Sequence, residues 1–195
     1  ADQWILQDPK KLSDWFKEQR KKLGETRGDQ LLRLMKYIKA WRAKKNGPKL
    51  PSGLLLTVLI NNHYQSNDRD DISYKNTIQS IKENLTWPFT VYNPVDLTEN
   101  LAGRVTREQY DSFKQKINNL CDAAIDAIKE DSKEKASRKW ISQFGDRFPE
   151  ADDDTEMLSE ALDNNDLAID AETGRASIAS RIGIQPFRSR EYGID

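Results

Sequence analysis

The segment "LPSGLLLTVLINNHY", residues 50–64, constrains the fold of this chain more than any other stretch. From Leu54 to Ile60 it is apolar except for Thr57, so a helix formed here has no polar side to turn towards solvent. A helix that is apolar all round has to be surrounded by other elements. Ser52, between a proline and a glycine, has the short hydroxyl typical of a helix N-cap. We therefore predict a buried central helix over 54–64, covered by further helices.

Other segments repeat apolar residues at the helical spacing and can provide that cover. This spacing predicts helices over 9–23, 29–41, 74–85 and 107–128, another that ends at Gly145, and a short one over 157–162. Thr106 and Gln109 form the sequence pattern of a capping box at the start of the longest helix. Residues 89–104 have no helical period and are expected to be extended. The predicted fold class is mainly α, a bundle of five to seven helices with little strand and an extended C-terminal tail.

Charge divides the chain into two parts. Residues 1–150 carry a net charge of +6, whereas residues 151–195, with eleven acidic and four basic side chains, carry −7. The C-terminal segment also has few apolar residues and several glycines. We therefore divide the chain into a helical domain, residues 1–164, and a mobile or wrapping tail, residues 165–195. The positive first part favours an anionic ligand, although a solvated surface with an acidic tail gives the same balance.

Few residues of the sequence could perform chemistry. The single cysteine, Cys121, and the single histidine, His63, exclude an internal disulfide and a four-ligand Cys/His zinc site. The carboxylates at 68–71 and 152–154 lie in polar stretches, and we interpret them as helix caps or solvated surface. His63 is interpreted as a partly buried structural residue. We identify no catalytic residue and no metal site, and the lone cysteine without any bilayer-length apolar run indicates a cytoplasmic location.

One face of the predicted helix 29–41 could hold phosphate. At about 100° per residue, Arg33 and Lys36 fall on one face, opposite the stripe that contains Leu34. The next helix is predicted to begin beside Ser52, and a helix N-terminus presents free N–H groups and the positive end of its dipole. Two cations near such a terminus form a reasonable phosphate site. The alternative is that both cations are solvated and Ser52 is only a cap. Lys39, turned about 60° away from Lys36, is expected to lie outside this site.

Several stretches together resemble a known family. The segments "LLRLMKYIKAW", "KLPSGLLLTVLINNHY", "NPVDLTENLA" and "FGDRFP" occur in the order found in the C-terminal helical lobe of bacterial cyclic-oligonucleotide-synthesising nucleotidyltransferases. These enzymes are relatives of cyclic GMP–AMP synthase and oligoadenylate synthase. The resemblance covers residues 4–149. It implies an enzyme that makes a cyclic di- or trinucleotide second messenger from nucleoside triphosphates, in bacterial anti-phage defence.

The resemblance also implies roles for particular residues. A lysine and a serine of the family's helical lobe touch the donor triphosphate, and they match Lys36 and Ser52 here, while Arg33 matches a position that is often basic. Gly53 stands where the animal enzyme has a base-stacking aromatic residue. The family's catalytic acids, which bind Mg²⁺, belong to an N-terminal half that precedes the matched region. We therefore expect a chain that binds ATP or another nucleoside triphosphate, needs that catalytic half as its partner, and is inactive alone.

Three further interpretations remain open at this stage. In some bacterial relatives a ubiquitin-transfer-like enzyme acts on the C-terminus, so the resemblance makes such an enzyme, or a regulatory protein, a possible partner of the tail. The main alternative function is a non-catalytic helical binding module whose basic face binds nucleic acid or a protein. A less favoured one is the helical part of another polymerase-β-like transferase. An upstream coding sequence with a Gly-Ser motif and an Asp-x-Asp strand would favour the synthase.

Overall fold

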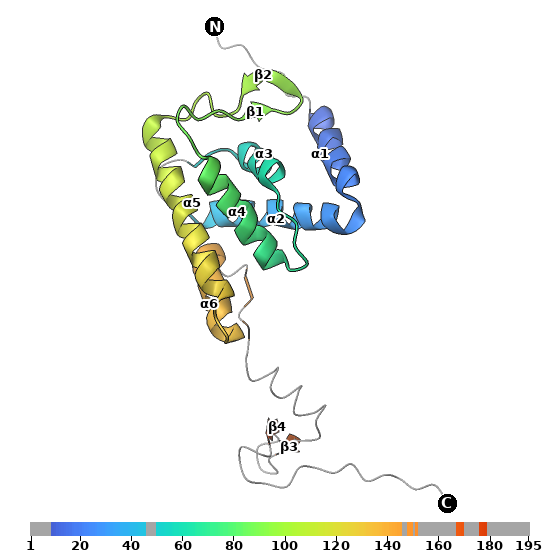
Figure 1. Ribbon diagram of the computed structural model, residues 1–195, viewed down its shortest axis with the longest axis vertical. Coiled ribbons are helices and arrows are strands. Elements are labelled where there is room, and N and C mark those ends of the chain that lie inside the picture. Colours follow the sequence, from blue (N-terminus) through green and yellow to red (C-terminus); the bar gives the residue numbers. More distant parts are fainter. Residues whose placement is uncertain are drawn as a thin grey trace, which may run out of the picture.

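The computed structural model describes residues 9–45, 50–145, 148–149, 151, 167–169 and 176–178. The described helices are α1 (Pro9–Leu23), α2 (Glu25–Lys44), α3 (Gly53–His63), α4 (Asp70–Asn84), α5 (Arg107–Ile128) and α6 (Lys133–Phe144). The described strands are β1 (Tyr92–Asn93), β2 (Asp96–Asn100), β3 (Leu167–Ile169) and β4 (Ala176–Ile178). Figure 1 shows α3 and α4 enclosed by α1, α2 and α5, with the β1–β2 hairpin beside them. The mainly helical fold class is confirmed.

The predicted central helix is α3, and its residues 55–60 are all buried. It runs antiparallel to α2, since one hydrogen bond joins the C-terminal part of α2 to the start of α3, and another joins the N-terminal part of α2 to the end of α3. Arg42 Nε of α2 donates to the carbonyl oxygen of Pro51, 2.7 Å away, just before α3. At the other end, the Tyr64 hydroxyl donates to Gln30 Oε1 at 2.7 Å. The start of α3 is therefore fixed against the last turns of α2.

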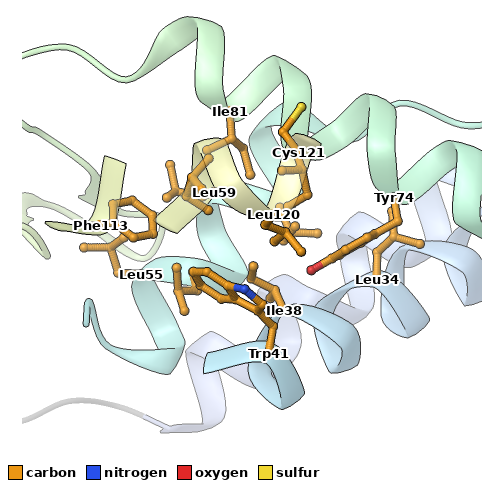
Figure 2. Close-up of a cluster of buried hydrophobic side chains, with 14 of the residues drawn as sticks. Leu34, Ile38, Trp41, Leu55, Leu59, Tyr74, Ile81, Phe113, Leu120 and Cys121 are labelled. Atoms are coloured by element: carbon orange, nitrogen blue, oxygen red, sulfur yellow. The ribbon is translucent and has the colours of Figure 1, made fainter. Parts of the chain in front are cut away.

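The core lies where α2, α3, α4 and α5 meet (Figure 2). Its largest fully buried side chain is Trp41, which has no exposed surface. Tyr74 is also enclosed, and burial raises the pKa of its hydroxyl well above the usual value. The other core side chains labelled in Figure 2 are Leu34, Ile38, Leu55, Leu59, Ile81, Phe113, Leu120 and Cys121. Since Trp41 and Leu34 belong to α2, this helix supplies core packing and the predicted basic face together.

The prediction that the second helix begins at Gly28 and Asp29 is wrong. The helix begins at Glu25, directly after Gly24, whose φ of 77° suits a glycine. Gly28 lies inside α2, where α1 comes very close. A Cβ built at Gly28 would be 2.5 Å from the carbonyl oxygen of Arg20, nearer than real contacts allow. The glycine is therefore explained by close packing of α1 on α2, and not by a helix start.

The predicted helix boundaries at Ser52, Thr106 and Gly145 are confirmed, whereas α2 (Glu25–Lys44) is longer at both ends than the predicted 29–41, and α4 (Asp70–Asn84) begins before the predicted 74–85. Ser52 Oγ accepts a hydrogen bond from the N–H of Leu55 at 3.1 Å. Thr106 and Gln109 form the expected capping box at the start of α5. At Gly145, which ends α6, φ is 68°. The Ser52 and Thr106 side chains satisfy helix N–H groups locally, which is why sequence alone located them.

The segment predicted to be extended forms a short hairpin. β1 and β2 pair antiparallel with an irregular register, Asn93 opposite Asp96. The Asn100 side chain accepts hydrogen bonds from the N–H groups of Val91 and Ala102 and holds the two ends together. β3 and β4 form a second antiparallel pair within the predicted tail. The predicted helix over 157–162 and the rest of the tail lie outside the described residues.

Candidate functional site

Arg33 of α2 is bound to the start of α4. Its Nη2 donates to Asp70 Oδ1 at 2.8 Å, and its Nε donates to Asp70 Oδ2. Asp70 also accepts hydrogen bonds from Gln30 Nε2 at 2.9 Å and from the Tyr37 hydroxyl at 3.3 Å. The charge of Arg33 is therefore already balanced by a carboxylate. Of the predicted phosphate-binding residues, it is the one whose charge is least available to a ligand.

The contact between Arg33 and Asp70 changes the pKa of Asp70 itself, and Asp70 in turn affects the pKa of the neighbouring Tyr37. Hydrogen bonds from Arg33 lower the pKa of Asp70, against the opposing effect of burial. Burial first, and then the charge of Asp70, raises the pKa of Tyr37. The pKa of Asp70 is lower in the folded protein than in the unfolded chain. The contact with Arg33 therefore stabilises the folded protein fully at pH values above the pKa that Asp70 has in the unfolded chain. This contribution is lost as the pH falls through the lower pKa that Asp70 has in the folded protein.

Replacing Asp70 with asparagine should therefore reduce stability near neutral pH and flatten its dependence on acid. The expected loss is about 1 kcal/mol, since Arg33 is nearly half exposed and water screens the pair. Urea unfolding at pH 7 and near pH 3 measures both effects. The variant and the parent should differ less at the lower pH. An equal difference at both pH values would show that the pair does not titrate as described.

Lys36 and Lys39 belong to a row of cations along α2. Arg33, Lys36, Lys39 and Arg42 are spaced three residues apart, so each lies about 4.5 Å further along the axis and about 60° around it. The two ends of the row are engaged, Arg33 by Asp70 and Arg42 by the Pro51 carbonyl. Lys36 and Lys39 between them are exposed. Neither forms an ion pair with any residue that the structure describes, so both ammonium groups are available to a ligand.

Ser52 and the start of α3 form the second part of the candidate site. Ser52 is exposed and caps the helix through Leu55. The first N–H groups of α3, those of Gly53 and Leu54, have no carbonyl four residues earlier within the helix. A Cβ built at Gly53 would meet nothing within 4 Å, so the space beside this turn is open. Free N–H groups at a helix start are suitable donors to a phosphate oxygen.

The structure brings Lys39 closer to this turn than the sequence suggested. Arg42 contacts Pro51, so the start of α3 lies on the Arg42 side of α2. Lys39 precedes Arg42 by about 4.5 Å along the axis, whereas Lys36 precedes it by about 9 Å. Lys39 therefore lies between Lys36 and Arg42 along the row, one step nearer than Lys36 to the residue that contacts the start of α3. The expectation that Lys39 stands outside the site is not supported by this arrangement.

The end of α2 is positively charged as well. Burial, followed by the nearby charges of Lys44 and Lys116, lowers the pKa of Lys45. Lys45 Nζ donates to Gln143 Oε1 at 2.9 Å, which holds its ammonium group without neutralising it. Three lysines thus gather near the α2 terminus that faces the start of α3. Such a local excess of cations favours an anionic ligand.

The remaining candidate groups have structural partners. His63 Nδ1 lies 3.1 Å from Ser80 Oγ, and burial lowers the pKa of its imidazole. Asp71 accepts hydrogen bonds from the guanidinium of Arg69, at 2.6 Å and 3.1 Å. The sequence interpretation of residues 68–71 as caps or solvated surface missed the contact between Asp70 and Arg33.

Within the described residues, no group of three or more His, Cys, Asp or Glu side chains could hold a metal ion. No described helix is long and apolar enough to cross a membrane.

Comparison with curated proteins finds relatives of one kind. The chain is 23% identical over 162 residues to a cyclic AMP-AMP-AMP synthase from an Acinetobacter species, covering 76% of this chain. It is 27% identical over 164 residues to a cyclic GMP-AMP synthase from Escherichia albertii, covering 82% of this chain. No protein-family model matches the sequence.

Comparison with solved structures gives the same result. The fold resembles that of a cyclic dinucleotide synthase. Vibrio cholerae DncV bound to a nonhydrolyzable GTP superposes with a TM-score of 0.63 at 22% identity, covering 78% of this chain and 41% of DncV. Escherichia coli DncV bound to 3′-deoxy GTP gives a TM-score of 0.61 at 23% identity, covering 75% and 40%. Over about three quarters of its length, the chain therefore shares sequence similarity and a helical fold with cyclic dinucleotide synthases.

The match covers less than half of each relative. The chain spans 44% of the Acinetobacter synthase and 35% of the Escherichia albertii synthase. The shared part is thus one portion of a larger protein in both cases.

Proposed function

We propose that this chain is the helical, nucleotide-clamping lobe of a nucleotidyltransferase that makes a cyclic di- or trinucleotide from nucleoside triphosphates. The observation that carries the proposal is the open, capped start of α3 beside the exposed Lys36 and Lys39, within a fold shared with synthases. Solved structures of DncV contain GTP, or ATP and GTP. The relatives with sequence similarity are named for cyclic products made from AMP and GMP units.

The donor triphosphate would lie along the row of cations on α2. Lys36 and Lys39 would contact phosphate oxygens, and Ser52 with the first N–H groups of α3 would hold the phosphate group at the end of the row. Lys36 and Arg42 are about 9 Å apart along the helix axis, so a ligand that reaches from Lys36 to the start of α3 must be extended. A triphosphate is extended and carries charge along its whole length. Arg33, held by Asp70, would contribute mainly to the long-range positive potential.

Catalysis would need groups that the described part of this chain does not bring together. Phosphoryl and nucleotidyl transfer commonly use Mg²⁺ ions held by carboxylates, which activate the attacking oxygen and stabilise the leaving one. We place those carboxylates in a catalytic half that precedes the matched region. Service in anti-phage defence, and contact of the tail with a ubiquitin-transfer-like or regulatory protein, belong to the same proposal through the family resemblance.

A comparison of two proteins tests the proposal. One is this chain alone, and the other is the longer protein that also includes the preceding coding region. Each is incubated with Mg²⁺ and the four nucleoside triphosphates ATP, GTP, CTP and UTP, and products are separated by chromatography. The longer protein should release pyrophosphate and form a cyclic product, whereas residues 1–195 should do neither. Turnover by residues 1–195 would contradict the division into lobes, and failure of the longer protein with all four nucleotides would contradict the synthase assignment.

A further inference from the structure

A second concave site lies on another side of α2. A cavity of about 480 Å³ opens between α2, α4 and α6. From α2 it is lined by Tyr37 and Ala40, which point about 160° and about 100° away from Lys39. The cavity is therefore turned away from Lys39 and Arg42, and it borders the side of Lys36, which lies about 40° around the helix from Ala40. Its volume falls within the range of about 300–1,000 Å³ that small-molecule sites occupy.

Half of the residues that line the cavity are aromatic. Three of its rings are close to parallel, with Phe148 inclined by 28° to Trp140 and by 20° to Phe144. Their centroids are 6.2 Å and 6.1 Å apart in these pairs. Tyr74 meets them at steeper angles, 60° to Trp140 and 52° to Phe144. Trp140 and Phe144 are buried, at 6% and 7% exposed, so the half-buried Phe148 is the one of these three rings that offers a flat face to a planar ligand.

The polar rim of the cavity is electrically neutral. Asp71 is paired with Arg69, and Asp70 is paired with Arg33. The two carboxylates balance the two guanidinium groups, so the rim attracts neither a strong anion nor a strong cation. Arg69 has an exposed side chain and uses only its Nε and one Nη towards Asp71. Its remaining N–H groups can donate to an acceptor on a ligand.

We propose that this cavity binds an uncharged, planar heteroaromatic ring of about the size of a nucleobase. The ring would stack on Phe148, which packs against Trp140 and Phe144, and an acceptor on its edge would face Arg69. The small side chain of Ala40 leaves the space at the α2 wall that the ring would occupy. This site goes beyond the proposed triphosphate site, because it would recognise a ring and not a phosphate.

Adenosine and guanosine, which carry the ring without phosphate, are suitable probes. Titration into ¹⁵N-labelled protein should shift the indole N–H signal of Trp140, assigned by its loss in Trp140→Phe, and the shift should saturate. Saturation-transfer spectra of the ligand should show stronger transfer to base protons than to ribose protons. Both measurements use residues 1–195 and do not depend on activity.

Two matched variants locate the binding. Ala40→Leu fills the cavity and should weaken the titration about tenfold or more, as a badly placed methylene does in an apolar pocket. Ala43→Leu adds the same side chain at an exposed position one turn further along α2 and should leave binding unchanged. Equal binding by both variants, or no Trp140 shift in the parent, would overturn the proposal. A Trp140 signal that moves with protein concentration alone would overturn it in favour of a second copy as the occupant.

Discussion

Replacing Lys36 with alanine should lower product formation by the complete synthase about tenfold to hundredfold. A charge-assisted hydrogen bond to phosphate contributes roughly 1.5–3 kcal/mol, and every 1.4 kcal/mol is about a factor of ten. The fold should survive, because Lys36 is exposed on the side of α2 that faces away from Leu34 and Ile38. Initial rates at several ATP and GTP concentrations, with circular dichroism of each variant, measure both outcomes.

Ser52→Ala should reduce the rate by a similar factor and also cost some stability. Loss of an N-cap hydroxyl typically costs about 0.5–2 kcal/mol, which a domain of this size can tolerate. A stability loss without a change in rate would show that Ser52 acts only as a cap.

The control for both variants is best taken from another helix. Lys114→Ala removes an exposed lysine of α5, whereas Lys39 lies too near the start of α3 to be neutral. Lys39→Ala should fall between the Lys36 variant and the control. If the Lys36, Lys39 and Lys114 variants all make product at the parent's rate, the row of cations does not hold the triphosphate.

Trp41→Ala should cost about 3–5 kcal/mol of unfolding free energy, the usual range for deleting a large buried aromatic side chain. Trp41 has no exposed surface and lies where α2 meets α3 and α5 (Figure 2). For a domain with a total stability of about 5–15 kcal/mol, this is a large share. Urea unfolding followed by circular dichroism measures the loss.

Tyr74→Phe is the matched comparison for the core. It keeps the buried ring and removes a hydroxyl that has no hydrogen-bond partner among the described residues. Removing a buried, unpaired polar group is expected to be nearly neutral or slightly stabilising. A loss at Tyr74→Phe as large as that at Trp41→Ala would mean that the hydroxyl has a partner in the folded protein.

Local patterns in the sequence were enough to predict much of the fold. An all-apolar helix such as α3 has to be central, and a capping hydroxyl such as Ser52 or Thr106 bonds to a neighbour only three residues away. These are short-range rules, so a single sequence reports them. The exposed position of Lys36 followed from the 3.6-residue period in the same way. The mainly helical fold is confirmed, whereas the phosphate-binding roles of Lys36, Ser52 and Arg33 remain predictions.

Contacts between distant residues were not predictable from local patterns. Arg33 and Asp70 are 37 positions apart, and no local pattern indicates that α4 begins beside α2. The bond from Arg42 to Pro51 places Lys39 near Ser52, and it depends on the packing of α3 on α2. The start of α2 is predicted too late because a glycine commonly marks a helix boundary, whereas Gly28 lies inside α2 and permits close contact with α1.

Gly28 has a consequence for how related chains can be recognised. Because even one methyl group at this position would collide with the backbone of Arg20, the requirement comes from main-chain atoms and is independent of the α1 side chains. Neighbouring side chains can vary without relieving it. We therefore expect distant relatives that keep this packing of α1 on α2 to keep a glycine about four residues after the glycine that separates the two helices. Its loss from an otherwise similar sequence would indicate that α1 packs elsewhere.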